Sequence, residues 1–457
     1  MRTRPDFKMT NPISRRSFMT LPALAPLGVL GSSLGADEHR FHYDHIIGTS
    51  LDLAVWTPHY IGSGGGTRNI ARQAAQAVLA EIHRLTAILS TYDPESEISR
   101  FDRFEHREPS RELAEVLELY RIWENRTGGV LSVRPRGATT PLNVDALGKA
   151  YIIDRSAEAA RLAVPDLAGL VLNIGGDIVV WGRECEVGIT DPAAPADNAD
   201  PLTRIVIRGG AVATSGTYLR GAHLIDARTG RTEIRASSST VVARNAVTAN
   251  ALASTLCILN ADEGMRLVER TRDAEALRID RSGAVQRSSG FTAVERFRRV
   301  QQTTAANWPL GYEVSIAVTL KPIPPGEDAP YLAAWVEDAT GKLVRAIVLW
   351  GSKDKYKPEL SSFWIITGGS KDLLYKVSKV TRLPGTYKIV WNGLDDNGKP
   401  VPKGNYRIVI ETNRYHGTYA KQSGMIACND IAATTTLSGT TNFESIIIQY
   451  GPKPTAV

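Results

Sequence analysis

The sequence predicts an α+β domain followed by an all-β domain of the immunoglobulin-like sandwich kind. Three observations carry this prediction. Before residue 275, stretches with helical apolar spacing alternate with short strand-like runs. Composition then changes near residue 300, and alternating apolar and polar residues dominate from residue 311 onward. The length of 457 residues fits two domains, which we place at residues 40–295 and 310–450.

The first 36 residues are expected to be a signal peptide. Arg15 and Arg16 precede a mildly apolar run over residues 18–30, and small residues up to Ala36 suit cleavage. This pattern is typical of twin-arginine export and predicts a periplasmic protein. The alternative is an amphipathic leader or a single membrane anchor, but a membrane span takes about 20 apolar residues. No other segment is long and apolar enough, so we expect no transmembrane helix in the mature chain.

Helices and strands of the first domain are expected in a fixed order. Residues 64–67 open the first helix with Thr67 as N-cap, and the second helix ends at Gly128 and Gly129. Further helices cover about 146–161 and 247–259. Between them we expect strands at 170–174, 178–181, 185–189, 205–207 and 212–214. The glycines before the first helix lack the strand–turn–helix context of a phosphate loop and indicate a flexible loop.

The second domain is expected to consist of strands. They cover residues 313–320, 331–337, 343–349, 386–390 and 406–411. Residues 395–398, Asp-Asp-Asn-Gly, predict a hairpin turn. We find no catalytic constellation in this domain, and we interpret it as a surface for a partner protein.

Composition excludes several classes of function. The net charge is +6, from 54 basic and 48 acidic residues, and part of the excess lies in the first sixteen residues. There is no compact basic and aromatic patch, so we expect no nucleic acid partner. Cys185, Cys257 and Cys428 form neither a zinc spacing nor a CxxC pair and are interpreted as buried thiols. The oligomeric state is left open.

Seven short motifs follow one another between residues 43 and 275, and their order is hard to obtain by chance. They are Ile47-Gly48-Thr49, Leu89 to Phe101 (LSTYDPESEISRF), Asp145 to Tyr151 (DALGKAY), Asn173 to Asp177 (NIGGD), Ala213 to Gly216 (ATSG), His223 to Gly230 (HLIDARTG) and Thr248 to Ser254 (TANALAS). Together they resemble the FAD:protein FMN transferase (ApbE-like) family. The second domain resembles an uncharacterised periplasmic domain that is fused to such transferases.

The resemblance implies a reaction in which the FMN half of FAD is transferred to a Ser or Thr of an exported redox protein, at an SGAT-like site, with release of AMP and with magnesium. The chemistry has clear physical needs. A diphosphate requires a hard cation and basic side chains, and the acceptor hydroxyl must lie in line and lose a proton. The flavin ring needs a partly apolar cleft with a stacking side chain.

By resemblance, eight residues would line the FAD site. They are Ile47, Tyr92, Val130, Leu131, Ser132, Asn143, Lys149 and Ile225. Tyr92 can stack on a ring system, although a structural corner residue is the alternative. Lys149, in the first turn of its helix, can reach a phosphate, although a solvated surface lysine is the alternative.

By the same resemblance, His223, Asp226 and Arg228 are the candidate catalytic residues. His223 is the best general base in the sequence, since an unperturbed histidine has a pKa of about 6.5. An ordinary hydrogen-bonded loop histidine is the alternative. The candidate magnesium ligands are the Ala146 carbonyl, Asn250, Ala253 and Ser254.

At the metal site the chain departs from the family pattern. Asn250 stands where a carboxylate is expected, and an uncharged amide oxygen binds magnesium more weakly. If the segment is extended, Asp145 would share a face with Asn143 and compensate. The open alternative is therefore a non-catalytic periplasmic flavin-binding protein with a partner-binding β-sandwich.

Overall fold

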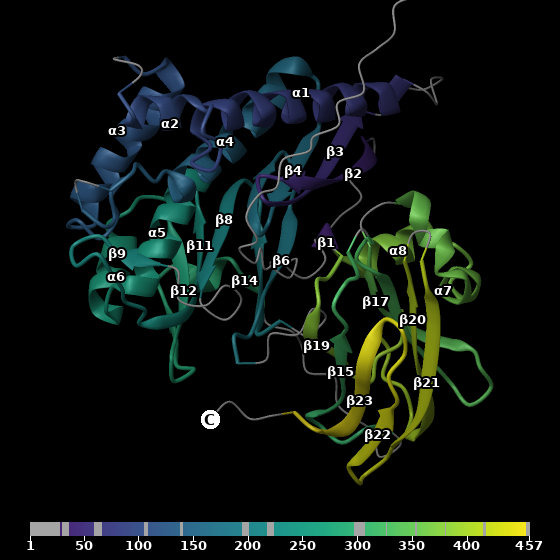
Figure 1. Cartoon of the computed structure of the whole chain (residues 1–457). Coiled ribbons are helices and arrows are strands. Elements are labelled where there is room, and N and C mark those ends of the chain that lie inside the picture. The colour runs from purple at the N-terminus through teal and green to yellow at the C-terminus, as the bar shows by residue number, and fades with distance from the viewer. Residues whose placement is uncertain are drawn as a thin grey trace, which may run out of the picture.

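The computed structural model (Figure 1) describes most of the chain. The described residues are 28–29, 36–58, 66–104, 108–137, 140–193, 201–216, 224–296, 307–325, 327–351, 354–379, 381–414 and 417–453. The predicted signal peptide lies outside them except for residues 28–29 and Ala36. Within the described residues, no helix combines the length and apolarity needed to cross a membrane.

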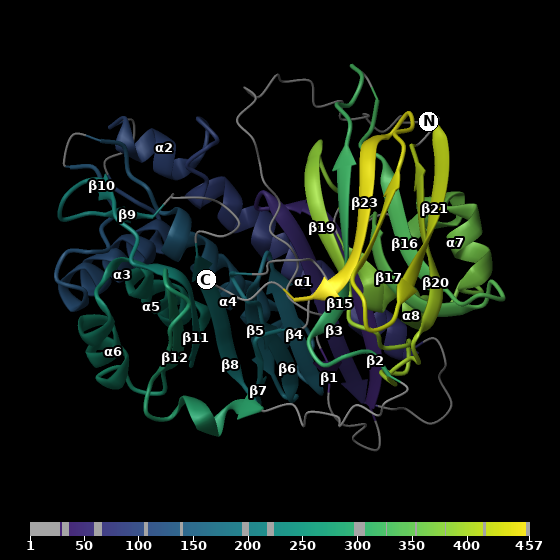
Figure 2. The ribbon, with the colours of Figure 1, turned by 90° about the horizontal axis from the view of Figure 1, so that it is seen from below.

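An eight-stranded antiparallel sheet forms the centre of the N-terminal region (Figures 1 and 2). Its strands, in spatial order, are β13 (Val285–Arg287), β12 (Glu275–Asp280), β11 (Ala236–Ala243), β8 (Gly210–Gly216), β5 (Asp177–Trp181), β4 (Gly169–Ile174), β3 (Thr49–Pro58) and β2 (Ala36–Ile46). A smaller sheet contains β1 (Gly28–Val29), β6 (Cys185–Ile189), β7 (Thr203–Ile207) and β14 (Glu295–Arg296). A two-stranded hairpin consists of β9 (Ile225–Asp226) and β10 (Arg231–Thr232).

Alternation along the central strands gives the large sheet two apolar faces. In β3, Leu51, Leu53 and Val55 belong to a core shared with helices, whereas Ala54 and Trp56 belong to a core shared with β6 and β7. Successive side chains of a strand point to opposite faces, so this strand must be covered on both sides. Helices therefore cover one face of the sheet and the small sheet covers the other.

The helices on that face are α1 (Gly66–Leu89), α2 (Glu97–Asp102), α3 (Arg111–Arg126), α4 (Asp145–Ala163), α5 (Ala246–Ile258) and α6 (Ala261–Glu269). A short 3₁₀ helix, η1 (Phe291–Ala293), precedes β14. The predicted helices at 146–161 and 247–259 and the predicted helix end at Gly128 agree with α4, α5 and α3. Thr67 is not an N-cap, because α1 already includes Gly66 and Thr67 is buried within the first turn.

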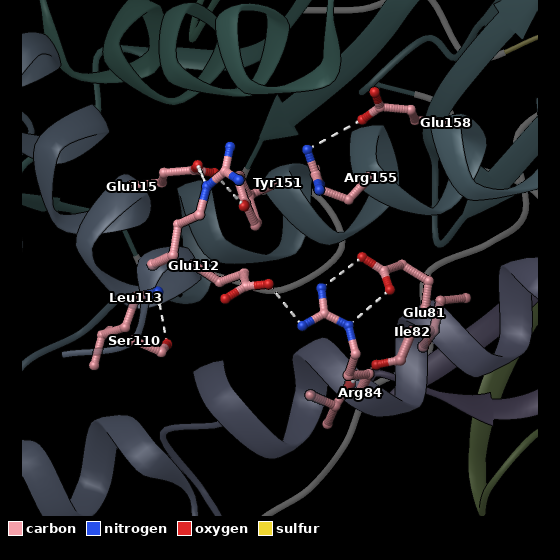
Figure 3. Close-up of polar contacts among 12 residues, drawn as sticks. Glu81, Ile82, Arg84, Ser110, Glu112, Leu113, Glu115, Tyr151, Arg155 and Glu158 are labelled. Atoms are coloured by element: carbon pink, nitrogen blue, oxygen red, sulfur yellow. Dashed lines mark hydrogen bonds and ion pairs between the residues drawn. The ribbon is translucent and has the colours of Figure 1, made fainter. Parts of the chain in front are cut away.

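Polar contacts fix α1, α3 and α4 relative to one another (Figure 3). Arg84 of α1 pairs with Glu112 of α3 at 2.7 Å, and the Tyr151 hydroxyl of α4 donates to Glu115 of α3 at 2.6 Å. Asp154 of α4 accepts the backbone N–H groups of Ala246 and Val247, at the start of α5. These contacts hold α4, which carries Lys149, in a defined position over the sheet.

The C-terminal region is built from two sheets. One has the order β19 (Gly385–Trp391), β15 (Tyr312–Leu320), β23 (Phe443–Pro452) and β22 (Ala433–Leu437). The other has the order β18 (Ser378–Lys379), β17 (Leu343–Trp350), β16 (Tyr331–Glu337), β20 (Gly404–Asn413) and β21 (Tyr419–Cys428). Residues of both sheets share one apolar core, so the sheets pack face to face. The immunoglobulin-like topology stays a prediction.

Several strands and helices of this region were not predicted. Strands β21 to β23 were missed, as were η2 (Asp354–Glu359), α7 (Ser361–Ile366) and α8 (Lys371–Val377). Phe363 and Leu374 of the two α-helices pack against the outer face of the five-stranded sheet. The predicted hairpin turn at residues 395–398 is confirmed locally, because Leu394 and Pro400 form an antiparallel bridge across it and the Asp395 N–H donates to the Lys399 carbonyl. Gly398 has φ 75°, and the longer strands on either side, β19 and β20, lie in different sheets.

Candidate functional site

Two glycine-containing turns touch at one end of the strands of the large sheet. Ile47 and Gly48 form the turn between β2 and β3, with φ of 48° and 72°. Gly175 and Gly176 form the turn between β4 and β5, with φ of 57° and 98°. A Cβ atom on Gly175 would lie 2.7 Å from the Thr49 side chain, so a glycine is required where these turns touch. The first and fourth motifs are thus neighbours in space.

Asp177 follows the second turn directly and is the centre of a polar cluster. Its side chain is buried, and its Oδ2 lies 2.7 Å from the Nζ of Lys149 on α4. The same oxygen lies 3.5 Å from the Nδ2 of Asn250 on α5. One strand and two helices therefore bring three of the motifs together. This carboxylate was not among the predicted site residues, although it was quoted within the NIGGD motif.

The structure differs from the predictions for Lys149 in two properties, its position in the helix and its exposure to solvent. It is the fifth residue of α4 and so lies in the second turn, not the first. Its side chain is 17% exposed and paired with Asp177, so it is not a solvated surface lysine. An ammonium group on a long, flexible stem can still exchange one anionic partner for another.

One turn before Lys149, Asp145 connects α4 to the loop after α1. The Thr91 hydroxyl donates to Asp145 Oδ1 at 2.5 Å, and the Tyr92 hydroxyl donates to Oδ2 at 3.1 Å. The Tyr92 side chain is 77% exposed, so it is not buried as a structural corner would be. An exposed ring whose hydroxyl is held in place is suited to stacking on a planar ligand.

Asn143 makes a hydrogen bond within its own loop. The prediction that Asp145 would compensate for it required an extended segment, and the segment is not extended. Asn143 Oδ1 accepts the Asp145 backbone N–H at 3.1 Å. Val144 has φ −107° and ψ 12°, and Asp145 already belongs to α4. The segment is therefore a helix start, where an asparagine satisfies a backbone N–H that has no partner within the helix.

The loop before α4 and the β9–β10 hairpin form a second part of the candidate site. The Val130 carbonyl accepts the Ala227 backbone N–H at 3.1 Å, next to Leu131 and Ser132. Ser132 Oγ accepts the Arg134 backbone N–H. The predicted residues Val130, Leu131, Ser132 and Ile225 thus belong to two segments that the structure joins.

Asp226 and Arg228 form a close pair in that hairpin. Arg228 donates to both carboxylate oxygens, at 2.9 Å from Nε and 2.7 Å from Nη2, and its backbone N–H adds a third hydrogen bond. These hydrogen bonds from Arg228 lower the pKa of Asp226, which is buried. Asp226 is therefore an anion that orients Arg228, whose side chain is 43% exposed. His223, the predicted general base, lies outside the described residues.

Ser254 and Ala253 lie one turn beyond Asn250 on α5. Ser254 Oγ lies 3.1 Å from Ser215 Oγ of β8, which joins the fifth and seventh motifs. The Ala253 carbonyl accepts a hydrogen bond from Ser239 Oγ at 2.5 Å. Asn250 and Ser254 share a helix face because they are four residues apart.

The predicted magnesium donors do not fit a divalent cation as these contacts stand. Magnesium prefers anionic oxygens, typically one or two carboxylates together with phosphates. Here position 250 offers an amide, and the nearby Asp177 carboxylate is already paired with Lys149. Among the described residues, no group of three or more His, Cys, Asp or Glu side chains is arranged to hold a metal ion.

The three cysteines are free and buried, as predicted. Burial raises the pKa of Cys257 to about 11 and that of Cys185 to about 12. Both thiols therefore stay protonated at neutral pH and are poor nucleophiles.

Comparisons with known proteins agree with the motif order. The sequence model of the ApbE family matches residues 47–136 and 132–278, together about half of the chain. A second family, described as a predicted periplasmic protein (DUF2271), matches residues 313–445. No curated protein matches the chain.

Solved structures that match the chain include three ApbE proteins. The ApbE protein from Thermotoga maritima MSB8 is 20% identical, with a TM-score of 0.48 over 57% of this chain and 100% of that chain. The flavin transferase ApbE from Vibrio cholerae is 18% identical, with a TM-score of 0.46 over 57% and 99%. The flavinyl transferase ApbE from Pseudomonas stutzeri, in its apo form, is 16% identical, with a TM-score of 0.47 over 58% and 98%.

Proposed function

The chain belongs to the ApbE family, and we propose that it is an FAD:protein FMN transferase that acts on exported redox proteins. The observation that carries the proposal is that separate motifs lie together at one end of the strands of the large sheet. Lys149 and Asn250 both contact Asp177, and Thr49 lies against Gly175 in the turn that precedes Asp177.

In the proposed reaction, an acceptor Ser or Thr hydroxyl attacks the phosphorus of the FMN half of FAD. A new O–P bond forms, the P–O bond to the AMP half breaks, and the hydroxyl proton passes to a base, for which His223 is our candidate. The ring of Tyr92 would stack on the flavin. Arg228, oriented by Asp226, and the ammonium of Lys149 would stabilise charge on the diphosphate.

The remaining predicted residues would complete the flavin site. Ile47 and Ile225 would supply apolar walls, and the segment Val130–Ser132 would supply backbone groups. Asn143 would keep the start of α4 in place. We assign no step to magnesium, and the predicted requirement for it, with Ala146, Asn250, Ala253 and Ser254 as ligands, stays a prediction.

We further propose that the protein is exported by the twin-arginine route and works in the periplasm. The Arg15-Arg16 motif supports this, and so does the match of the C-terminal region to a family described as periplasmic. The acceptor would carry an SGAT-like site, and the C-terminal region would contact a partner.

The test is AMP release from FAD by the purified chain, with and without magnesium, in the presence of a peptide that bears an SGAT site. We expect AMP to appear together with a fluorescent peptide that carries covalent flavin. FAD binding without AMP release would contradict the transferase.

The same assay tests the second candidate, a flavin-binding protein without transfer activity. The amide at Asn250 and the pairing of Lys149 with Asp177 favour this candidate. Native transfer activity would reject it.

A further inference from the structure

A cation and an amide both face the buried carboxylate of Asp177. Lys149 Nζ lies 2.7 Å and Asn250 Nδ2 lies 3.5 Å from the same oxygen, Oδ2. Because a carboxylate only accepts hydrogen bonds, the amide nitrogen of Asn250 is the group that faces it.

The charges in this cluster balance within the protein. Asp177 contributes one negative charge, Lys149 contributes one positive charge, and Asn250 is neutral. A buried carboxylate without a partner is strongly destabilising, so the ammonium is an essential neighbour of Asp177. The position that an external cation would occupy beside this oxygen is taken by a cation from the chain itself.

The residue at position 250 decides whether this balance holds. An aspartate there would place a second carboxylate about as close to Asp177 as the amide is now, and two carboxylates that near one another repel strongly. With only one lysine beside them, the pair would have an excess negative charge. A divalent cation would then be the natural way to neutralise the pair.

We propose that Lys149 is the resident counter-ion of Asp177 and takes the place of a divalent metal ion at this point, and that Asn250 preserves the balance. The inference rests on the proposed function only in locating the FAD diphosphate at this cluster. Its test needs neither flavin nor acceptor, so it can fail while transfer is observed, and the reverse also holds.

The experiment measures the Tm of the full mature chain with and without millimolar MgCl₂. We expect no shift for the native chain. Asn250→Asp should melt lower than the native chain without magnesium and regain about 2–4 °C when magnesium is added, because the ion binds only the folded state. Lys149→Met should gain a similar response, since it leaves Asp177 without its counter-ion.

Asn260→Asp is the matched control. Asn260 caps α6 and is exposed, and aspartate is an equally good cap, so this variant adds the same charge away from Asp177. Its Tm should not respond to magnesium. Lys149→Arg keeps a positive charge beside Asp177 and should also not respond.

A magnesium-dependent rise in the native chain as large as that of Asn250→Asp would overturn the proposal. An Asn250→Asp variant that binds no magnesium would overturn it as well. Should Lys149→Met not fold, Lys149→Arg remains decisive, because a magnesium response of that variant contradicts Lys149 as the charge that fills the site.

Discussion

Asp177 in the N-terminal region and Glu411 in the C-terminal region are both buried carboxylates, but their partners differ in kind. Asp177 is held by the side chains of Lys149 and Asn250. Glu411 accepts the backbone N–H groups of Ser362 and Phe363, at 2.9 and 2.8 Å, at the start of α7, and its one hydrogen bond with another side chain in the described residues is with Tyr419. Side chains can turn toward a ligand, whereas backbone donors leave only if the helix moves. We therefore interpret Asp177, held by side chains that can move, as part of a candidate binding site. Glu411, held mainly by backbone donors, is interpreted as a structural contact.

The largest effect should come from the aromatic core of the C-terminal region. Trp391 is 1% exposed, and its ring centroid lies 4.7 Å from that of Trp308 and 4.9 Å from that of Tyr406. Trp391→Ala should lower the free energy of unfolding of this region by about 3–5 kcal/mol, as measured by denaturant unfolding. Ile365→Ala, at a side chain that is 77% exposed, should have almost no effect.

FAD binding by Trp391→Ala tests whether the flavin site depends on the C-terminal region. The two regions have separate cores, so we expect flavin affinity to stay at the native level. A parallel loss of flavin binding would mean that the site depends on the C-terminal region.

A slightly smaller effect, on the rate of AMP release, is expected from a substitution in the β9–β10 hairpin of the N-terminal region. Arg228→Lys keeps the charge but loses the planar fork that Asp226 orients, and we expect AMP release to fall by about 10²-fold. Arg231→Lys, in the exposed strand β10 of the same hairpin, should release AMP at the native rate. Equal rates for both variants would remove Arg228 from the proposed machinery.

Glu411→Gln should be less harmful to stability than Trp391→Ala. The amide accepts only through its single oxygen and carries no charge, so α7 loses part of its capping, at about 1–3 kcal/mol. Thermal unfolding measures the change, with the exposed Glu444→Gln as control. If Glu411 is purely structural, transfer activity below the melting range will be unchanged. A specific loss of activity would contradict a structural role for Glu411.

The smallest effect concerns pH and His42 on β2. Burial alone would lower the pKa of His42, but hydrogen bonds to Asp44 and Asp52 raise it to about 9. Because the folded-state pKa lies above the usual value of about 6.5, this stabilisation is complete below pH 6.5 and is lost as the pH rises through about 9. We expect His42→Gln to remove about 1–2 kcal/mol of pH-dependent stability, measured by unfolding at several pH values.

Local patterns predicted α1, α3, α4 and α5 but not the shorter helices α2, α6, α7 and α8, and they missed strands β2, β3, β11 and β12 of the large sheet. Helical spacing located α3, α4 and α5, and capping chemistry located the end of α3 at Gly128. Turn chemistry identified the short hairpin at residues 395–398 but not that β19 and β20 on either side belong to different sheets, because a turn sequence does not say which sheet the next strand will join. Strands β21 to β23 were missed, although they pair extensively.

The candidate site was predictable only in part. Motif order selected Lys149 and Asn250, but their common contact Asp177 lies 28 residues after one and 73 before the other in the printed sequence. Such contacts depend on how α4, α5 and β5 pack, which no local pattern contains. The two residues were expected to act separately, one on phosphate and one on metal. The structure instead makes them neighbours of one carboxylate.

Trp308 determines how short a fragment of the C-terminal region can be made. Its ring lies among Trp391, Tyr406 and Tyr450, so it belongs to this core although it precedes the predicted boundary at residue 310. A fragment that starts at residue 310 would have a cavity the size of an indole. We therefore expect limited proteolysis to release a stable piece only when the cut falls before Trp308, and recombinant expression of the isolated region should begin there.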